Sequence, residues 1–437
     1  MNSIFAIVST TIFFIFSGWY LTYLLPKLEK VERVGLAFLL GAGLTTFIWY
    51  IVYRVGLPLN LYTLALAGFI LSALSYLLTK VLKLSILPLV LVKLSISEKR
   101  LTLAIIFGLI IAFTIGIYHP LTAWDSIAQY DFRGHAIAID HDLSFIKAGA
   151  YFLSYPLMIS LVHAVVYLLG GASAQGIHAI IFASFIAIVY GRMKDWTNSK
   201  YALLTCLLLV GQNELFDHAT FAYTNLPYTS YLVAGILYAI SSGAYSLIIS
   251  ALLVGSSTWV RSAEVFWLVG LLLFIIQSVR VKKISYALVS IFIIMGMRSA
   301  WSSYVVSIFK SIGFPTETNL SHVNIDVIGK IIPKLEQIYW YLYLNIILPY
   351  LGIWFLIIPT LAIIFIKKSN KLLLLVSTVI LSAGIAVGGV MIFSTYYPTW
   401  NEIGDSARRM ILFIVPLTLI TAIYALYLLD NKEKNEN

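Results

Sequence analysis

The fold class is decided by the stretch LTLAIIFGLIIAFTIGIYHPLTAWDSIAQYDFRGHA, residues 101–136, which changes from apolar to polar at one point. Residues 101–118 are almost wholly apolar, and about 20 such residues are needed to cross the roughly 30 Å of hydrocarbon in a bilayer. From His119 onward, acids, histidines and an arginine follow within a few positions of one another. The change predicts a membrane-crossing helix that delivers a polar loop to one face of the bilayer.

The composition extends this reading to the whole chain. Of its 437 residues, 60% are hydrophobic and 11% are charged, and the mean hydropathy is +0.93. Because apolar segments recur to the C-terminus, we expect an all-α, polytopic transmembrane bundle without a soluble domain. The net charge of +10 does not indicate a nucleic-acid partner, since Lys and Arg cluster in short loops between apolar segments. The single cysteine, Cys206, supports neither a disulfide nor a thiolate metal site.

The basic loops orient the chain, because loops rich in Lys and Arg stay in the cytoplasm. They predict about thirteen crossings with the N-terminus outside, the C-terminus inside and the first helix retained. The segment 155–171 is predicted to be an outer interfacial or re-entrant helix, since a crossing there would place the basic loop 192–200 outside. The predicted spans are 3–25, 35–53, 58–80, 101–118, 175–191, 201–213, 224–241, 245–259, 262–279, 285–301, 340–366, 371–394 and 408–429.

Polar residues on the predicted outer face gather in 119–155, 212–225, 302–338 and 395–409. Charges at membrane depth are costly and by default mark a functional site. Asp125 stands at the mouth of the bundle, and on a helix it would share a face with Gln129 and nearly oppose Asp131. It is either a general base for an incoming hydroxyl or amine or the N-cap of an interfacial helix.

The segment 213–227, NELFDHATFAYTNLP, places Asp217 and His218 at an outer helix end. One Asp and one His could begin a metal site, but no third ligand has suitable spacing. Ordinary loop polarity is the alternative, and the sequence does not indicate a metal.

Arginines at predicted outer positions form the last group. Arg261 and Glu264 are three residues apart in an apolar run, and they form either an internal salt bridge or a phosphate site in which Glu264 orients the cation. Arg408 and Arg409 precede the last span on the outside, against the usual bias. They are either phosphate ligands, which suits the planar donor fork of Arg, or anchors to lipid headgroups.

The order of these motifs resembles the GT-C superfamily of integral-membrane glycosyltransferases. The chain has an outer loop that opens with Trp124-Asp125, then YPL (155–157), TWVRSAE (258–264) and SARRMILFIVPL (406–417). It looks most similar to the branch of protein O-mannosyltransferases and lipid A aminoarabinose transferase. Those enzymes have a first large extracytoplasmic loop with a catalytic Asp near its start and juxtamembrane helices after it.

The resemblance implies a role for each motif. Asp125 would be the general base, and Arg261 with Arg408 or Arg409 would bind the donor phosphate. Two positions depart from the family pattern, because Ser126 stands where many relatives have a second acid and Asn225 where many have Asp. The residues expected to line or orient the site are Trp124, Asp131, Arg133, Tyr155, Asp217, His218 and Glu264.

The implied function is inverting transfer of a sugar from a polyprenyl-phosphate lipid to a glycan, lipid or protein acceptor at the outer face of the cell membrane. No cofactor is implied. The chain would divide into N-terminal helices with an inner interfacial segment (1–100), a catalytic membrane module (101–430) with its outer loop (119–155), and a cytoplasmic tail (431–437). Two alternatives stay open: a polysaccharide polymerase or ligase that uses a pyrophosphate-linked donor, and a lipid or polysaccharide transporter.

Overall fold

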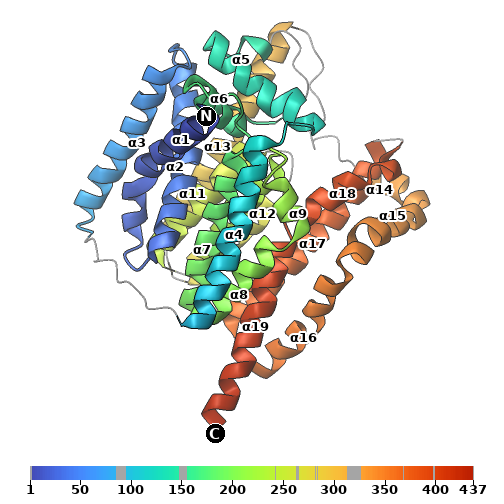
Figure 1. Ribbon diagram of the computed structural model, residues 1–437. Coiled ribbons are helices and arrows are strands. Elements are labelled where there is room, and N and C mark those ends of the chain that lie inside the picture. The colour runs from blue at the N-terminus through green and yellow to red at the C-terminus, as the bar shows by residue number, and fades with distance from the viewer. Residues whose placement is uncertain are drawn as a thin grey trace. The chain divides into compact units, whose positions relative to one another are not determined.

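The computed structural model describes residues 2–84, 95–146, 155–241, 243–261, 265–280, 282, 284–312, 326–367, 369–396 and 399–436. In these ranges the chain forms helices and no strand. Its contacts divide it into two compact units, Met1–Ile308 (unit 1) and Phe309–Asn437 (unit 2), which are described separately below (Figure 1). The all-α prediction is confirmed.

Nine helices in the described ranges are long and apolar enough to cross a membrane, and they overlap nine of the thirteen predicted spans. A polytopic membrane protein is therefore supported by the length and composition of its helices. These helices are Ser3–Leu24, Lys30–Arg54, Leu61–Val81, Ile96–Tyr118, Ile177–Trp196, Ile284–Ile308, Val327–Ile364, Asn370–Tyr396 and Gly404–Asn431.

The other four predicted spans are shorter helices: α8 (Ser199–Val210), α10 (Asn225–Ile240), α11 (Ala244–Val260) and α12 (Trp267–Arg280). At 1.5 Å per residue, each is shorter than the roughly 30 Å of a hydrocarbon core. The count of thirteen crossings therefore stays a prediction. Helix α6 (Met158–Leu168) has 11 residues, and the interfacial or re-entrant assignment of 155–171 likewise stays a prediction. The predicted inner interfacial segment lies mostly outside the described residues.

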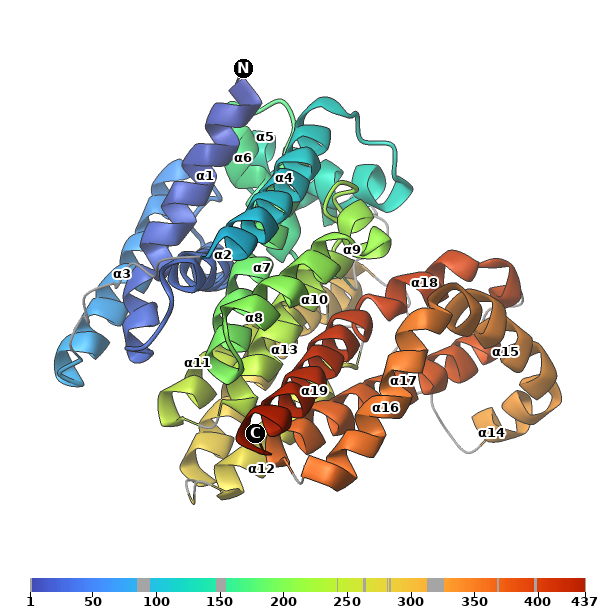
Figure 2. The same ribbon diagram turned by 60° about the horizontal axis from the view of Figure 1, so that its bottom comes forward.

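The remaining helices of unit 1 are α1 (Asn2–Gly18), α2 (Lys30–Arg54), α3 (Leu61–Val81), α4 (Ile96–Tyr118), α5 (Phe132–Asp140), α7 (Ile177–Trp196), α9 (Asn213–His218) and α13 (Ile284–Ile312). Helix α2 packs against α1, α3, α7 and α11, and Figures 1 and 2 show α1, α2 and α3 side by side. Helices α1 and α2 approach through glycine, because a Cβ on Gly41 would overlap the carbonyl of Phe14. Such close backbone approach is typical of membrane helices.

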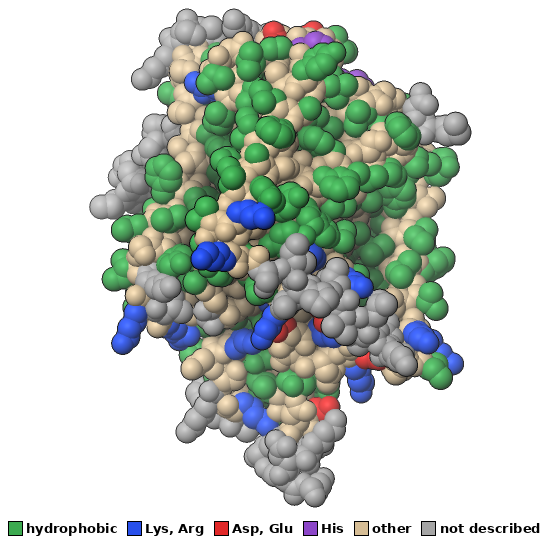
Figure 3. Space-filling model, turned by 90° about the vertical axis from the view of Figure 1, so that its left-hand side faces the viewer, with side chains coloured by type: hydrophobic (Ala, Val, Ile, Leu, Met, Phe, Trp, Pro, Cys, Tyr) green, Lys and Arg blue, Asp and Glu red, His purple; other side chains and the backbone are tan. Residues whose placement is uncertain are grey.

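Two contacts within unit 1 join helix ends that the predicted topology places on the same side of the membrane. At the predicted outer side, Ser3 at the start of α1 accepts hydrogen bonds from the amides of Ala172 and Ser173, just before α7. At the predicted inner side, Lys194 near the end of α7 lies 2.8 Å from Glu29, just before α2. In Figure 3 most of the visible Lys and Arg side chains lie in the lower half of the face, and the His side chains lie at its upper edge.

Cysteine labelling in a Cys206→Ser background tests which end faces the cytoplasm. Ile139 is 73% exposed on α5, and Lys200 is exposed at the start of α8. We expect Ile139→Cys to react with a membrane-impermeant maleimide in intact cells, and Lys200→Cys to react only after the inner face is opened, because basic loops stay inside. The opposite pattern would invert the topology.

Unit 2 contains α14 (Asp326–Ile331), α15 (Leu335–Leu342), α16 (Leu351–Lys367), α17 (Asn370–Tyr396), α18 (Gly404–Ile411) and α19 (Val415–Glu436). Helices α16 and α17 pack against α19, and the Tyr341 hydroxyl donates to the Ile403 carbonyl at 2.7 Å just before α18. The predicted last span, 408–429, lies within the candidate span Gly404–Asn431, in which a short turn at 412–414 separates α18 from α19. Arg408 and Arg409 thus lie on a short helix of their own.

Candidate functional site

The predicted outer loop begins with a helical segment that packs against the rest of unit 1. Residues Trp124 and Asp125 are helical, and a π-helical turn follows from Ser126 to Asp131. The Ser126 hydroxyl donates to the carbonyl of Phe221, which fixes this turn to the segment after α9. Asp125 has helical backbone angles and its side chain makes no capping hydrogen bond. The N-cap interpretation of Asp125 is therefore wrong.

Arg261 is the buried cation of the site. Helix α11 ends at Val260, and the extended backbone of Arg261 brings its guanidinium to three neutral oxygens. Nη1 donates to Oγ1 of Thr224 and Oδ1 of Asn225, both at 3.1 Å, and Nη2 donates to the Tyr155 hydroxyl at 3.3 Å. The guanidinium also lies 4.9 Å from the centre of the Tyr155 ring. These contacts orient a side chain that is only 7% exposed.

Tyr130 connects Arg261 with the turn that carries Asp125. The Thr224 hydroxyl, which accepts from Arg261, donates to the Tyr130 hydroxyl at 2.9 Å. Burial raises the pKa of the Tyr130 phenol; the charge of Arg261 lowers it and the charge of Asp125 raises it. Both charges therefore act on one hydroxyl group. Asp125 itself is half-buried and accepts a 3.5 Å hydrogen bond from Gln129, which confirms the predicted shared face.

Arg133 supports the same cluster through a hydrogen bond to the backbone of Tyr155. It is 1% exposed, and its Nη1 donates to the backbone carbonyl of Tyr155 at 3.1 Å. Burial lowers the pKa of Arg133 to about 10, against the opposing effects of Tyr130 and Tyr155. Arg133 thus positions Tyr155, while Trp124 is 70% exposed at the start of the helical segment.

Asp131 belongs to a different cluster. Its carboxylate accepts from the Tyr167 hydroxyl and lies 3.5 Å from Nδ1 of His163 and 3.6 Å from Nδ1 of His135. Burial acts to raise the pKa of Asp131, but His163, Tyr167 and His135 hold it below the usual range. The second nitrogen of His163 faces Nε2 of His178 at 3.1 Å. Asp131 therefore serves the contact with α6 and α7, away from the oxygens that bind Arg261.

Asp217 and His218 are the last two residues of α9, which confirms that they lie at a helix end. His218 is buried, and its Nδ1 lies 2.9 Å from the carbonyl of Glu214. Asp217 is exposed. No group of three or more His, Cys, Asp or Glu in the described part of the chain could hold a metal ion. Helix α11 ends at Val260 and Glu264 lies outside the described residues, so the pairing of Arg261 with Glu264 stays a prediction.

The two arginines of unit 2 are consecutive residues in the last turn of α18. Nη2 of Arg409 is 2.9 Å from Oδ2 of Asp405, an i,i+4 pair, and Arg408 is exposed. The predicted approach of these arginines to Arg261 stays a prediction, since Arg261 belongs to unit 1.

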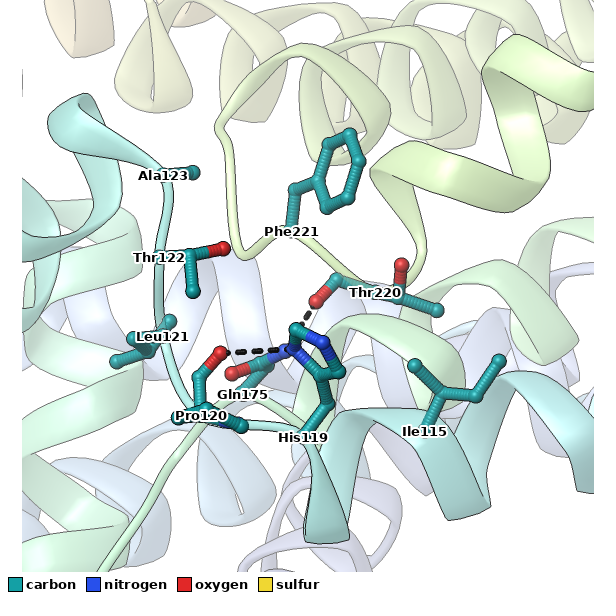
Figure 4. Close-up of a pocket in the computed structure, with 9 residues that line it drawn as sticks. All are labelled: Ile115, His119, Pro120, Leu121, Thr122, Ala123, Gln175, Thr220 and Phe221. Carbon is teal, nitrogen blue, oxygen red and sulfur yellow. Dashed lines mark hydrogen bonds between the residues drawn. The ribbon is translucent and has the colours of Figure 1, made fainter.

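A cavity of about 80 Å³ lies directly before Trp124 (Figure 4). One wall is the segment from His119 to Ala123, and the other is formed by Gln175, Thr220 and Phe221. The side-chain amide nitrogen of Gln175 donates to the Thr220 carbonyl and ties the far wall together. The cavity thus adjoins the helical segment that carries Asp125.

Several residues of these clusters were not predicted. Tyr130 and Thr224 carry no signal in the sequence beyond their polarity, and Asn225 was noted only as a departure from a family pattern. His163 had a usable signal, because it interrupts the apolar run SLVHAVV at positions 160–166, and a titratable residue in such a run is a candidate for function.

The site as a whole combines a buried guanidinium and two phenols with the half-buried carboxylate of Asp125, which lies in the same helical segment as Tyr130. Comparison of the chain with family models, with curated proteins and with solved structures finds no match in any of the three. Its function is therefore inferred from the chemistry of these side chains.

Proposed function

We propose that the chain is an integral-membrane glycosyltransferase that moves a sugar from a polyprenyl-phosphate lipid to an acceptor on the outer face of the membrane, with inversion. Asp125 is the general base, and Arg261 binds the donor phosphate. Arg408 and Arg409 are expected to add to phosphate binding.

One observation supports this proposal above the others. Arg261 and Tyr155 are 106 residues apart and hydrogen-bonded, and Arg261 reaches Tyr130 through Thr224. Asp125 lies in the same short helical segment as Tyr130, to whose hydroxyl Thr224 donates. The motifs at 155–157 and 261 are thus in direct contact, and the segment that begins with Trp124 and Asp125 continues to Tyr130, which Thr224 links to Arg261.

The chemistry that this cluster offers fits an inverting transfer. The acceptor oxygen attacks the anomeric carbon from the face opposite the phosphate while its proton passes to Asp125. The bond between that carbon and the phosphate oxygen breaks, and polyprenyl phosphate leaves with the electron pair. Because this leaving group is already ionised, it needs a cation more than a proton donor, and an arginine fork suits a phosphate.

Arg261→Gln is expected to weaken donor binding by about tenfold or more, because a hydrogen bond to a charged group contributes about 1.5–3 kcal/mol. Binding of a polyprenyl-phosphate hexose to the purified protein measures this. Arg280→Gln is the matched control, since Arg280 ends α12 at the predicted inner side and its loss should leave donor binding unchanged.

Since Arg261 also holds Tyr155 and Thr224, a conservative variant separates binding from folding. Arg261→Lys keeps the charge but not the planar fork, and we expect donor affinity between those of wild type and Arg261→Gln. Equal donor affinity in all three proteins would reduce Arg261 to a structural residue.

Supplying two donors tests the reaction class directly. We expect reconstituted protein to transfer sugar from a polyprenyl-phosphate donor and not from a pyrophosphate-linked one, and the product anomer to be inverted by NMR. Transfer only from the pyrophosphate-linked donor would establish the polymerase or ligase alternative. Movement of intact lipid between leaflets without any transfer would establish the transporter alternative.

A further inference from the structure

The cavity before Trp124 presents hydrogen-bond acceptors that the described residues do not satisfy. Gln175 is 2% exposed, and its side-chain oxygen has no hydrogen-bond partner among the described residues, although its amide nitrogen binds Thr220. A buried polar atom without a partner costs about 1–3 kcal/mol. A ligand or water that donates a hydrogen bond to this oxygen removes that cost.

His119 supplies a second acceptor. Its Nδ1 lies 2.9 Å from the carbonyl of Pro120, as Figure 4 shows. A carbonyl oxygen can only accept, so Nδ1 carries a proton, and in that tautomer of the uncharged imidazole Nε2 is an acceptor. The hydroxyl of Thr122, which lines the same wall, can donate or accept.

The side chains that line the cavity indicate the class of ligand. None of the described residues that line the cavity is Lys, Arg, Asp or Glu, and Leu121, Pro120 and Phe221 provide apolar surface. Acceptors beside an apolar wall, without charge, suit a neutral molecule that has several hydroxyl groups and a C–H face. The volume of about 80 Å³ is several times the roughly 10–15 Å³ needed for one water, so part of a sugar ring fits.

We infer that this cavity is the acceptor subsite, and that it binds a neutral sugar unit of a glycan acceptor. The inference rests on the proposed function, because it names the acceptor of that reaction. The position of the cavity agrees with it: Ala123 ends the near wall two residues before Asp125, and Phe221 of the far wall accepts the hydrogen bond of Ser126. A sugar held there presents a hydroxyl toward the helical segment that carries the base.

Binding and transfer are measured together to test this inference. The probes are methyl glycosides of neutral hexoses and pentoses, with binding followed by saturation-transfer NMR on purified protein. Thr122→Val and His119→Leu each remove one polar partner, and we expect about threefold to tenfold weaker sugar binding, which corresponds to one hydrogen bond. Thr114→Val is the matched control, because its hydroxyl bonds the carbonyl of Ile110 within α4 and lies outside the cavity.

In the transfer assay, the same cavity variants should raise the acceptor KM by a similar factor and leave donor binding and unfolding temperature unchanged. Transfer with unchanged acceptor KM in the cavity variants would overturn this inference while the proposed function stands. If the cavity variants weaken sugar binding but the protein transfers sugar from neither donor, the proposed function is overturned and the cavity remains a sugar-binding site. Binding of none of the glycosides would also overturn the inference.

Discussion

Asp125→Asn is expected to reduce the rate of sugar transfer by about 10²–10⁴-fold, the usual contribution of a general base. The substitution keeps the size of the side chain and an oxygen that can accept from Gln129, but it removes the capacity to take up the acceptor's proton. Donor affinity should change little, because the phosphate is assigned to Arg261. Single-turnover transfer and equilibrium donor binding, measured on the same preparation, separate the two effects.

Asp131→Asn is the matched control. The Asp131 carboxylate contacts Tyr167, His163 and His135 rather than the cluster around Arg261. We expect this variant to lose stability more than turnover, because the amide disturbs the hydrogen bonds that hold α6. Near-wild-type turnover in Asp125→Asn, or a larger loss in Asp131→Asn, would remove Asp125 as the base.

The fold class followed from hydropathy alone, because a bilayer permits few structures other than helices for apolar segments of this length. The number of crossings does not follow from hydropathy in the same way. Residues 201–213 read as a span, yet α8 has 12 residues and ends at Val210. Hydropathy does not distinguish a short helix buried among other helices from one that crosses lipid, because both have an apolar surface.

The candidate site was predictable where a residue is charged and stands at the edge of an apolar segment. Asp125 and Arg261 meet this condition, and Thr224 links Arg261 to Tyr130 in the helical segment that begins with Trp124 and Asp125. Residues whose role depends on tertiary contact were not predictable. Thr224 accepts from Arg261 and donates to Tyr130 only because α10 begins beside the end of α11. For the same reason, no sequence spacing connects His163 with Asp131, 32 positions earlier.

A buried ion pair joins α2 to α7, and its sequence signal was also missed. Nε and Nη2 of Arg192 donate to the two carboxylate oxygens of Glu32 at 2.5 and 3.0 Å, and the Tyr238 hydroxyl donates to Glu32 at 2.8 Å. Glu32 is 0% exposed and Arg192 is 6% exposed. A Cβ on Gly191 would overlap the Glu32 carboxylate, so glycine is required for this close approach. Arg192 was read as a loop residue because a basic residue near a span end usually marks the cytoplasmic side.

Glu32→Gln is expected to lower the free energy of unfolding by about 3–5 kcal/mol, because it leaves the buried Arg192 with only the exposed carboxylate of Asp195, 3.5 Å from its Nη1. Unfolding in mixed micelles, followed by circular dichroism, measures the change. Lys194→Gln is the control, since its partner Glu29 is 34% exposed on the side chain and such a pair contributes less than about 1 kcal/mol.

A triple variant separates the burial of charge from the packing of α2 against α7. Replacing Glu32→Leu, Arg192→Met and Tyr238→Phe together removes both charges and the hydroxyl, and apolar replacement of a buried pair is often close to neutral. We therefore expect the triple variant to be more stable than Glu32→Gln alone, although it carries more substitutions. If the triple variant is instead the less stable of the two, the pair stabilises the helices by more than its desolvation costs. A Glu32→Gln protein that unfolds like the wild type would mean that Arg192 finds water or another partner at this end of α7.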